Sequence, residues 1–581
     1  MKKHPLKKAV LRAAGRKTAG APAKLARVCK RLNILAFLSL FHTALLGALP
    51  AQKLVYPGEW PYEALKTLSM EQHTLFFSSY ALSVAQFRAM LADLDEETLS
   101  ESGRELYEKL YSWLEGPALV SFEYGPLAIE GWPAIQTEFY VRSNKSIDWI
   151  TTNRDRNPFI VIPAAISVSP WVTLELDFEA AQNYNTIYKD DNYTNFPLPD
   201  TNYNMPRRAY LALGYPFTEK IGVQFRMGIG EEFYGDTHTG SIILSDYMKD
   251  ISYGKFSLYS PVIAWTSNIM QLSVNKYFYY HTLEARLLRR FTISYLEGLM
   301  ANAPLEFRFL NPVMIYHSFA AYSEYGEYNR GDPDQFIDDE DSRVASFFAA
   351  KAEFEPVSNI RLYALWALNE LQTPQERKDD PEVLRADSMG FQLGAEAQFP
   401  HAGGYWFFGA EGVYNSPFFY VSKDSRWSFY KPGTAKSGSV RNWIGSPFGP
   451  DSAAAVLWGG RKTTSWSLTG SFLFSAGGER SGLGIFDTDT YHPWRTKNHD
   501  EVFLFSPTGI VCYTWQPSLK AAWSPRDWLS LQVMLGYSVV QNYAHRQDRL
   551  EHGFEGSLSV KIAPNIIHAR YGKEEGLKVW R

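Results

Sequence analysis

The chain has 581 residues, of which 58 are basic and 62 acidic, and its formal net charge is −4. An acidic balance argues against nucleic acid as a partner, because such a surface repels phosphate backbones. The two cysteines, Cys29 and Cys512, are too few for a disulfide framework or a cysteine metal site.

The first 51 residues are predicted to be a secretory signal peptide, cleaved after Ala51. Positions 1–31 carry eleven basic residues and no acid, and an apolar run at 34–49 ends in small residues. A single membrane anchor is the alternative, but the run is shorter than the ~20 apolar residues that a spanning helix needs. Without residues 1–51, 47 basic and 62 acidic residues remain, a net charge near −15.

Residues 52–117 are predicted to form a small periplasmic bundle of two or three helices. Ser100 is a suitable N-cap for a helix that ends at Gly116 and places Leu106, Leu110, Trp113 and Leu114 on one face. Residues 83–94 repeat this helical spacing. We expect the bundle to pack against the rest of the protein, with binding of a partner as the alternative.

From residue 118 to 581 the spacing of apolar residues changes to every second position, which is typical of strands. The clearest segments are 221–229, 391–399, 465–474, 529–537 and 554–562. Strands of about nine to eleven residues cross a bilayer when tilted. Aromatic residues make up 15% of the chain, as in the aromatic girdles of membrane barrels.

A lipid-exposed sheet must close, because open edges leave backbone groups unpaired in hydrocarbon. We therefore predict an all-β transmembrane barrel in the outer membrane of a diderm bacterium. Counting candidate segments predicts about 16–20 antiparallel strands, with 18 as the best estimate.

The stretch HTLEARLLRRFTISYLEG, residues 281–298, fits both a helical and a strand period. Strand-like segments lie on both sides of it. An isolated helix in the wall would expose open strand edges to lipid. We therefore interpret the stretch as one long strand or as two strands that turn at Leu288 and Arg289.

A group of charged residues in and after this stretch is the candidate ligand-binding set of the lumen. Leu305–Phe309 is predicted to be a strand with its charged residues on the inner side. Two interpretations remain open: the charges pair and fill the interior, or they form a polar track for an anionic or hydroxylated ligand. The set comprises Glu284, Arg286, Arg290, Glu297, Glu306 and Arg308.

No catalytic motif stands out, so neither an enzyme nor a cofactor is predicted. The sequence has no G-x-S-x-G, H-E-x-x-H or phosphate-loop pattern. WGGRKTTS at 458–465 lacks the first glycine of a phosphate loop and is predicted to be a turn. The acidic loop at 326–343 lacks the EF-hand spacing, so a solvated loop is favoured over a calcium site and no metal is expected. An outer-membrane hydrolase is the remaining catalytic alternative.

The order of these features resembles the Wzi family of capsule-assembly outer-membrane barrels. The similar parts are the helical segment, GSIILSDYMKDISYGKFSLYSPVIAW, and the stretch from YHTLEARLLRRF to NPVMIYHS, which contains Glu297 and Asn311-Pro312. Residues 322–329 (YSEYGEYN), RLYALWAL and EGVYNSPFFYV also resemble the family, so the similarity covers about 110–425.

The resemblance implies a barrel of about eighteen strands with a periplasmic helical bundle and a lectin-like, non-catalytic role. The expected partners are surface glycan or a small solute, within membrane lipid and lipopolysaccharide. The alternative function is a porin-like channel for anionic or sugar solutes.

Overall fold

The computed structural model describes part of the chain. Residues 1–49, which include almost all of the predicted signal peptide, and the acidic loop at 326–343 lie outside the described residues. No helix among the described residues is long and apolar enough to cross a membrane. The described residues are 50–581 except 117–119, 125, 148–156, 169, 183–192, 196–200, 203–207, 246–247, 249, 312, 318–343, 380–385, 423–425, 427, 436–437, 480–504, 527, 564–566, 573–575 and 581.

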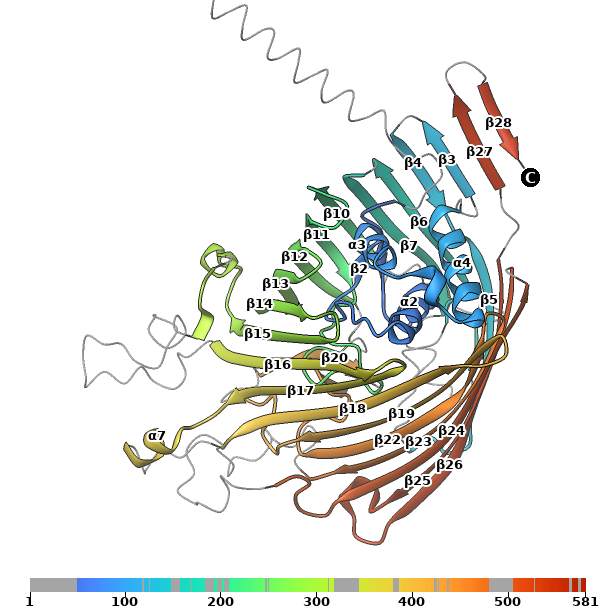
Figure 1. Ribbon diagram of the computed structural model, residues 1–581. Helices are drawn as coiled ribbons and strands as arrows, with labels where there is room; N and C mark the ends of the chain where they lie inside the picture. Colours follow the sequence, from blue (N-terminus) through green and yellow to red (C-terminus); the bar gives the residue numbers. More distant parts are fainter. Residues whose placement is uncertain are drawn as a thin grey trace, which may run out of the picture. The chain divides into compact units, whose positions relative to one another are not determined.

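Eighteen antiparallel strands in the described part of the chain form a closed barrel, as the sequence predicts (Figure 1). The ring closes where β26 pairs with β5. In ring order the strands are β5 (Ala134–Arg142), β6 (Ile160–Val168), β7 (Val172–Gln182), β10 (Ala209–Pro216), β11 (Gly222–Gly230), β12 (Ile251–Tyr259), β13 (Ile263–Ser273), β14 (Lys276–Leu287), β15 (Phe291–Asn302), β16 (Val344–Val357), β17 (Ile360–Glu370), β18 (Ser388–Pro400), β19 (Gly404–Asn415), β22 (Ser452–Thr463), β23 (Trp466–Gly477), β24 (Cys512–Arg526), β25 (Leu529–Gln541) and β26 (Leu550–Ile562).

Burial across the wall is the reverse of that in a soluble protein. On β18, Leu393 and Phe399 are 62% and 43% exposed on the outer face, whereas Gln392 and Gln398 are 0% and 7% exposed on the inner face. Because apolar side chains face outward and polar ones inward, the exterior matches hydrocarbon and the interior does not. The alternation read from the sequence is therefore that of a transmembrane wall.

The two ends of the barrel differ in the length of their connections. At one end, the short-turn end, neighbouring strands join through a few residues, such as 358–359 between β16 and β17. At the other, the long-loop end, most connections are long, such as 416–451 between β19 and β22. In outer-membrane barrels the short turns are periplasmic and the long loops are outside.

The ambiguous stretch 281–298 forms two strands, β14 and β15, joined by a tight turn. Leu288 and Arg289 have φ of 53° and 60°, the left-handed region used by the hairpin turns that match strand twist. The prediction of a turn at these two residues is confirmed.

The predicted N-terminal helices are present as α2 (Trp60–Glu71), α3 (Val84–Leu91) and α4 (Glu101–Glu115). Ser83 and Gln86 form a capping box at the start of α3, and the Ser100 hydroxyl accepts the N–H of Gly103 in α4. The helices surround a core of their own that includes Leu65 and extends to Ala264 on β13. We call residues 50–116 the plug.

The other helices and strands are not members of the closed ring. The barrel closes at β26, so the last residues are not its closing strand; β28 pairs with β27, which pairs with β3. These elements are β1 (Leu54–Val55), β2 (Leu82–Ser83), β3 (Val120–Tyr124), β4 (Leu127–Gly131), β8 (Tyr193–Thr194), β9 (Thr201–Asn202), β20 (Tyr430–Ala435), β21 (Gly438–Trp443), β27 (Ile567–Gly572), β28 (Gly576–Trp580), α7 (Pro374–Asp379) and the 3-10 helices η2 (Glu96–Thr98), η4 (Phe307–Leu310) and η7 (Tyr543–His545).

Candidate functional site

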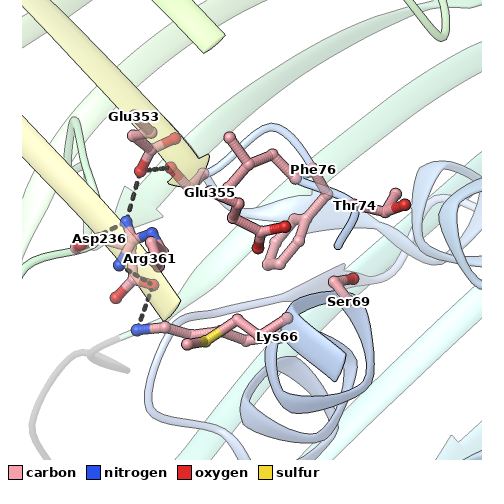
Figure 2. A pocket seen from close by; sticks show the side chains of 11 residues that line it. Lys66, Ser69, Thr74, Phe76, Asp236, Glu353, Glu355 and Arg361 are labelled. Atoms are coloured by element: carbon pink, nitrogen blue, oxygen red, sulfur yellow. Dashed lines mark hydrogen bonds and ion pairs between the residues drawn. The ribbon is translucent and has the colours of Figure 1, made fainter. Parts of the chain in front are cut away.

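A network of buried charges joins helix α2 of the plug to the inner wall. Lys66 Nζ lies 2.8 Å from Asp236 Oδ2 and 2.9 Å from Glu396 Oε2. Arg361 on β17 lies 2.9 Å from the same Glu396. It also pairs with Glu353 on β16 (Figure 2). Buried charges are tolerated only when they are paired, so these contacts fix the plug in one position.

The next part of this network contains Glu284, one of the residues picked out in the sequence. Lys351 Nζ lies 3.0 Å from Glu284 Oε1 and 3.2 Å from Glu353 Oε2. The plug contributes two hydroxyls: Ser78 donates to Glu353 at 2.7 Å and Ser79 donates to Glu284 at 2.9 Å. Glu284 is therefore a buried link between wall and plug.

Arg286 makes a second attachment, nearer the short-turn end. Its guanidinium lies 3.0 Å from Asp93 Oδ2 and donates to the Leu75 carbonyl at 3.1 Å, both in the plug. Lys220 contacts the same Asp93 at 2.5 Å. Burial opposes ionisation of this carboxyl, but the hydrogen bonds from Lys220 and Arg286 hold the pKa of Asp93 below its ordinary value.

The connection between β11 and β12 folds into the lumen from the other side. We call residues 231–245 the inward loop. Its Glu232 lies 2.9 Å from Arg226 and 3.0 Å from Lys255, and accepts a hydrogen bond from Asn268 at 2.9 Å. Burial alone would raise the pKa of Glu232, but the two cations outweigh it and keep the pKa below its ordinary value.

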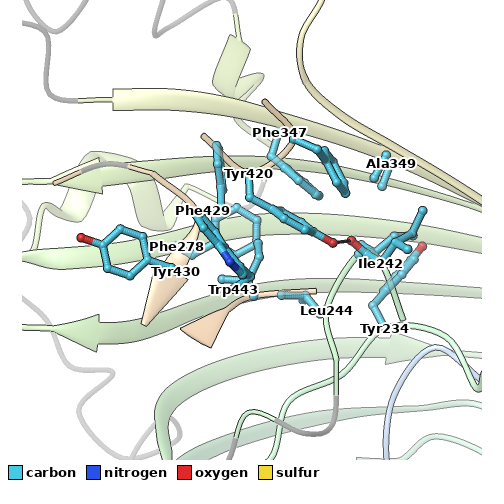
Figure 3. Packing of buried hydrophobic residues seen from close by; sticks show 14 of the residues in the cluster. Tyr234, Ile242, Leu244, Phe278, Phe347, Ala349, Tyr420, Phe429, Tyr430 and Trp443 are labelled. Atoms are coloured by element: carbon cyan, nitrogen blue, oxygen red, sulfur yellow. Dashed lines mark hydrogen bonds between the residues drawn. The ribbon is translucent and has the colours of Figure 1, made fainter. Parts of the chain in front are cut away.

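Toward the long-loop end, the lumen is filled by apolar side chains (Figure 3). The inward loop supplies Tyr234 and Ile242, and the β19–β22 connection supplies Tyr420 and Trp443. The Tyr420 hydroxyl donates to the carbonyl of Ile242. Inward wall residues such as Phe347 complete the cluster. Two connections from the long-loop end therefore fill this part of the lumen.

The inner wall from β22 to β25 differs, because water reaches it. Lys520 and Ser524 point inward and are exposed, and the Ser471 and Ser518 hydroxyls are 2.6 Å apart. Facing this wall, His238 of the inward loop is exposed and stacks on Trp458, with ring centroids 3.8 Å apart and planes 5° apart.

The Trp458 ring occupies space that is free because residue 409 on the neighbouring strand is a glycine. It pairs with Gly409 across β19 and β22, and a Cβ at Gly409 would lie 2.1 Å from the indole ring. Because the ring lies over Gly409 on one side and against His238 on the other, it is held in one orientation. An aromatic stack beside a row of hydroxyls offers an apolar face and hydrogen-bonding groups together, the combination typical of ligand sites.

Two cavities in the described part of the lumen are small. One, lined by Lys66, Glu355 and Arg361, has about 10 Å³ of space for the centre of a water molecule (Figure 2). The other, lined by Gln86 and Arg286, has about 20 Å³. Each holds about one or two waters, so neither is a path for a solute.

The six predicted site residues do not form one lumen cluster. Glu284 and Arg286 point into the lumen, 1% and 7% exposed, as their alternation predicts. Lumen positions for Arg290 and Glu297 are wrong. Arg290 lies exposed in the β14–β15 turn, and Glu297 shares the outer face of β15 with Tyr295.

Lumen positions for Glu306 and Arg308 are also wrong, as is the strand predicted at 305–309. Pro304, which lacks an N–H, follows the end of β15, and the chain forms the 3-10 helix η4 instead. Glu306 and Arg308 pair with each other at 2.6 Å. The structure does not test whether any of the six residues contacts a ligand. Their ligand-binding role therefore stays a prediction.

Sequence reasoning missed the other members of the site. Lys351, Glu353, Arg361 and Glu396 all lie on the inner side of strands, and their alternation was the available signal. No local sequence pattern identified Lys66, which is a charged residue on the buried side of a helix. The turn predicted at 458–465 is confined to Thr464 and Ser465, and Trp458 lies within β22.

A closed wall with an apolar exterior and buried inner charges defines a transmembrane β-barrel of the outer-membrane class. The sequence matches no family model, and no curated protein resembles it in sequence.

Among solved structures, Wzi of Escherichia coli has the same fold. It aligns over 87% of this chain and 98% of its own, with a TM-score of 0.52 and 12% identity. It is described as a carbohydrate-binding β-barrel involved in group 1 capsule assembly. The predicted resemblance to the Wzi family is confirmed at the level of the fold.

Two other outer-membrane proteins are more loosely similar. OprD of Pseudomonas aeruginosa has a TM-score of 0.37 and 8% identity over 76% of this chain and 94% of its own. DcaP of Acinetobacter baumannii has a TM-score of 0.34 and 7% identity over 75% of this chain and 97% of its own. Likeness at this level carries no weight for function.

Proposed function

We propose that this protein is a non-catalytic outer-membrane barrel that holds surface polysaccharide at the cell exterior. The observation that carries the proposal is the occupied lumen: buried ion pairs such as Lys66–Glu396 anchor the plug, and an apolar cluster fills the long-loop side. A barrel built to pass solutes needs a continuous wet path. A barrel that holds a polymer does not.

The proposed contact for the polysaccharide is the water-accessible inner wall from β22 to β25. Sugar rings present C–H faces that pack on aromatic rings, and hydroxyls that exchange hydrogen bonds with side chains such as Ser471 and Ser518. The stack of His238 on Trp458 supplies the aromatic surface. Glu284 and Arg286 are engaged with the plug, so we assign them to anchoring rather than to the ligand.

The test combines two measurements on the purified, membrane-reconstituted protein. We expect nearly silent planar bilayers at neutral pH and measurable binding of oligosaccharides released from the source bacterium's surface polysaccharide. Steady channel conductance without binding would overturn the proposal.

The second candidate is a porin-like channel for anionic or sugar solutes. The observation that favours it is the same wet wall, where Lys520 places an exposed cation on the inner face. In this case bilayers would conduct, with a preference for anions that is lost in Lys520→Gln.

A further inference from the structure

The outer face of the wall carries a polar pair where hydrocarbon is expected. His281 on β14 and Glu297 on β15 pair across the strands and share the outer face with Leu283 and Tyr295, which are 50% and 48% exposed. Ionisable groups on the lipid side of a barrel are costly near the midplane. Something other than lipid must therefore cover this pair.

The segment that follows β15, residues 303–311 and 313–317, covers this pair from outside the barrel. The Tyr316 ring stacks on His281 with centroids 4.5 Å apart, and its hydroxyl lies 3.0 Å from His281 Nε2. Glu297 accepts the backbone N–H of His317 at 2.9 Å. Phe309 packs on Tyr279, with centroids 5.1 Å apart. The segment is thus held flat against the wall by polar and aromatic contacts.

Most of the exposed side chains of this segment are apolar, and the exposed Arg308 is paired with Glu306 at 2.6 Å. Phe307, Val313 and Ile315 are 85%, 83% and 62% exposed, and Leu305 and Leu310 are 48% and 39% exposed. These values equal or exceed those of many lipid-facing side chains on the neighbouring strands. The patch therefore continues the apolar exterior of the barrel instead of interrupting it.

Many backbone groups of the segment are satisfied without water, as an apolar surrounding requires. The N–H groups of Phe309, Asn311 and Met314 donate to carbonyls within the segment at 3.2–3.3 Å. The Phe309 carbonyl accepts the Tyr316 hydroxyl at 2.9 Å. The Val313 N–H donates to the Asn311 side chain at 3.2 Å.

The depth of the segment follows from the length of β15. This strand has twelve residues, and about nine to eleven cross the hydrocarbon when tilted. Its end at Asn302 therefore lies near the rim of the membrane at the long-loop end, and a segment that folds back over Leu299 and Ala301 lies just below that rim.

We infer that residues 303–311 and 313–317 lie in the outer leaflet and bind its acyl chains through the patch of Phe307, Val313 and Ile315. The segment replaces a stretch of bare wall that carries His281 and Glu297 with an apolar surface. It acts as a membrane anchor for the connection between β15 and β16.

The test attaches the fluorophore bimane to a cysteine at Val313 in a Cys29→Ser, Cys512→Ser background. The protein is reconstituted in phosphatidylethanolamine–phosphatidylglycerol vesicles with or without brominated acyl chains. Leu283→Cys on the wall is the lipid-facing control, and Gln547→Cys in the β25–β26 turn is the aqueous control. Ile315→Cys repeats the test if Val313→Cys does not fold.

We expect brominated lipid to quench the label at Val313 as strongly as at Leu283, with protection from aqueous iodide. Iodide quenching like that at Gln547 would overturn the inference, because the segment would then face water. Protection from both quenchers would also overturn it, because protein, such as a second copy of the chain, would then cover the patch.

Discussion

At the residue scale, the sign of each inner-wall charge matters less than whether it has a partner. Arg361 pairs with Glu353 and Glu396, and all three are nearly buried. Removing this cation leaves Glu353 with Lys351 and Glu396 with Lys66 as the remaining cations, so carboxylates outnumber cations in a low-dielectric interior. The protein must then accept uncompensated charge or move the plug.

We therefore predict that Arg361→Met destabilises the folded barrel by about 3–5 kcal/mol. The measurement is the temperature at which the folded band on a detergent gel converts to the unfolded band. The matched control is Arg377→Met, whose pair with Asp387 is more accessible and contributes about 0–1 kcal/mol. Equal shifts for the two variants would contradict the account.

The aromatic stack permits a residue-scale test of the proposed ligand contact. Trp458→Ala should weaken binding of the polysaccharide fragments by about tenfold or more, equivalent to about 1.4 kcal/mol. Trp406→Ala is the control, because Trp406 lies on the outer face of the adjacent strand β19. Isothermal titration measures both. Unchanged affinity in Trp458→Ala would remove this wall from the proposal.

The sequence predicted the positions of some of these residues correctly and of others wrongly. Glu284 and Arg286 were placed correctly because side chains on a strand alternate strictly. Glu297 was assigned to the lumen although it lies two residues from Tyr295 and therefore on the same, outer face of the strand. Glu306 and Arg308 were misplaced because β15 ends before Pro304. Lys66 and Glu396 are 330 positions apart, and only closure of the barrel brings them together.

At the scale of elements, the plug and the wall are joined mainly by charge and hydrogen bonds. Asp93 and Glu232 both have a pKa below that of an ordinary carboxyl, because cations surround them. A carboxyl with a lowered folded-state pKa stabilises the folded state above its unfolded pKa of about 4 and loses that contribution as pH falls further.

We accordingly predict that acid loosens the plug. Bilayers that are silent at neutral pH should gain conductance as the pH falls below about 4, where these carboxylates take up protons. Asp93→Asn, which removes one ionised partner of Arg286 and Lys220, should raise conductance already at neutral pH. Glu97→Gln, on an exposed residue of the plug, is the control. Conductance independent of both pH and Asp93 would contradict this view of the plug.

The strands and the plug helices could be predicted because each carries a local pattern. Alternation identified β11, β18 and β25, and a serine cap with a glycine end identified α4. The inward loop could not be predicted, because its apolar residues look the same whether a loop packs inside a barrel or forms a strand. Its role depends on the diameter of the closed ring, which no local pattern reports.

At the scale of the whole molecule, the fold combines a membrane-spanning wall with an interior largely built from its own chain. The plug enters at the short-turn end and the inward loop and the β19–β22 connection meet it from the long-loop side. One stretch of inner wall, β22 to β25, stays wet. We propose that this asymmetry suits a barrel that holds a ligand.

The central claim concerns surface polysaccharide, so attachment in cells tests it most directly. The measurement is the ratio of cell-attached to shed polysaccharide in the source bacterium, in a strain with the gene deleted and in strains complemented with wild type or Trp458→Ala. We predict that deletion shifts polysaccharide into the medium, that wild type restores attachment and that Trp458→Ala restores it poorly. An unchanged ratio in the deletion strain would contradict the account.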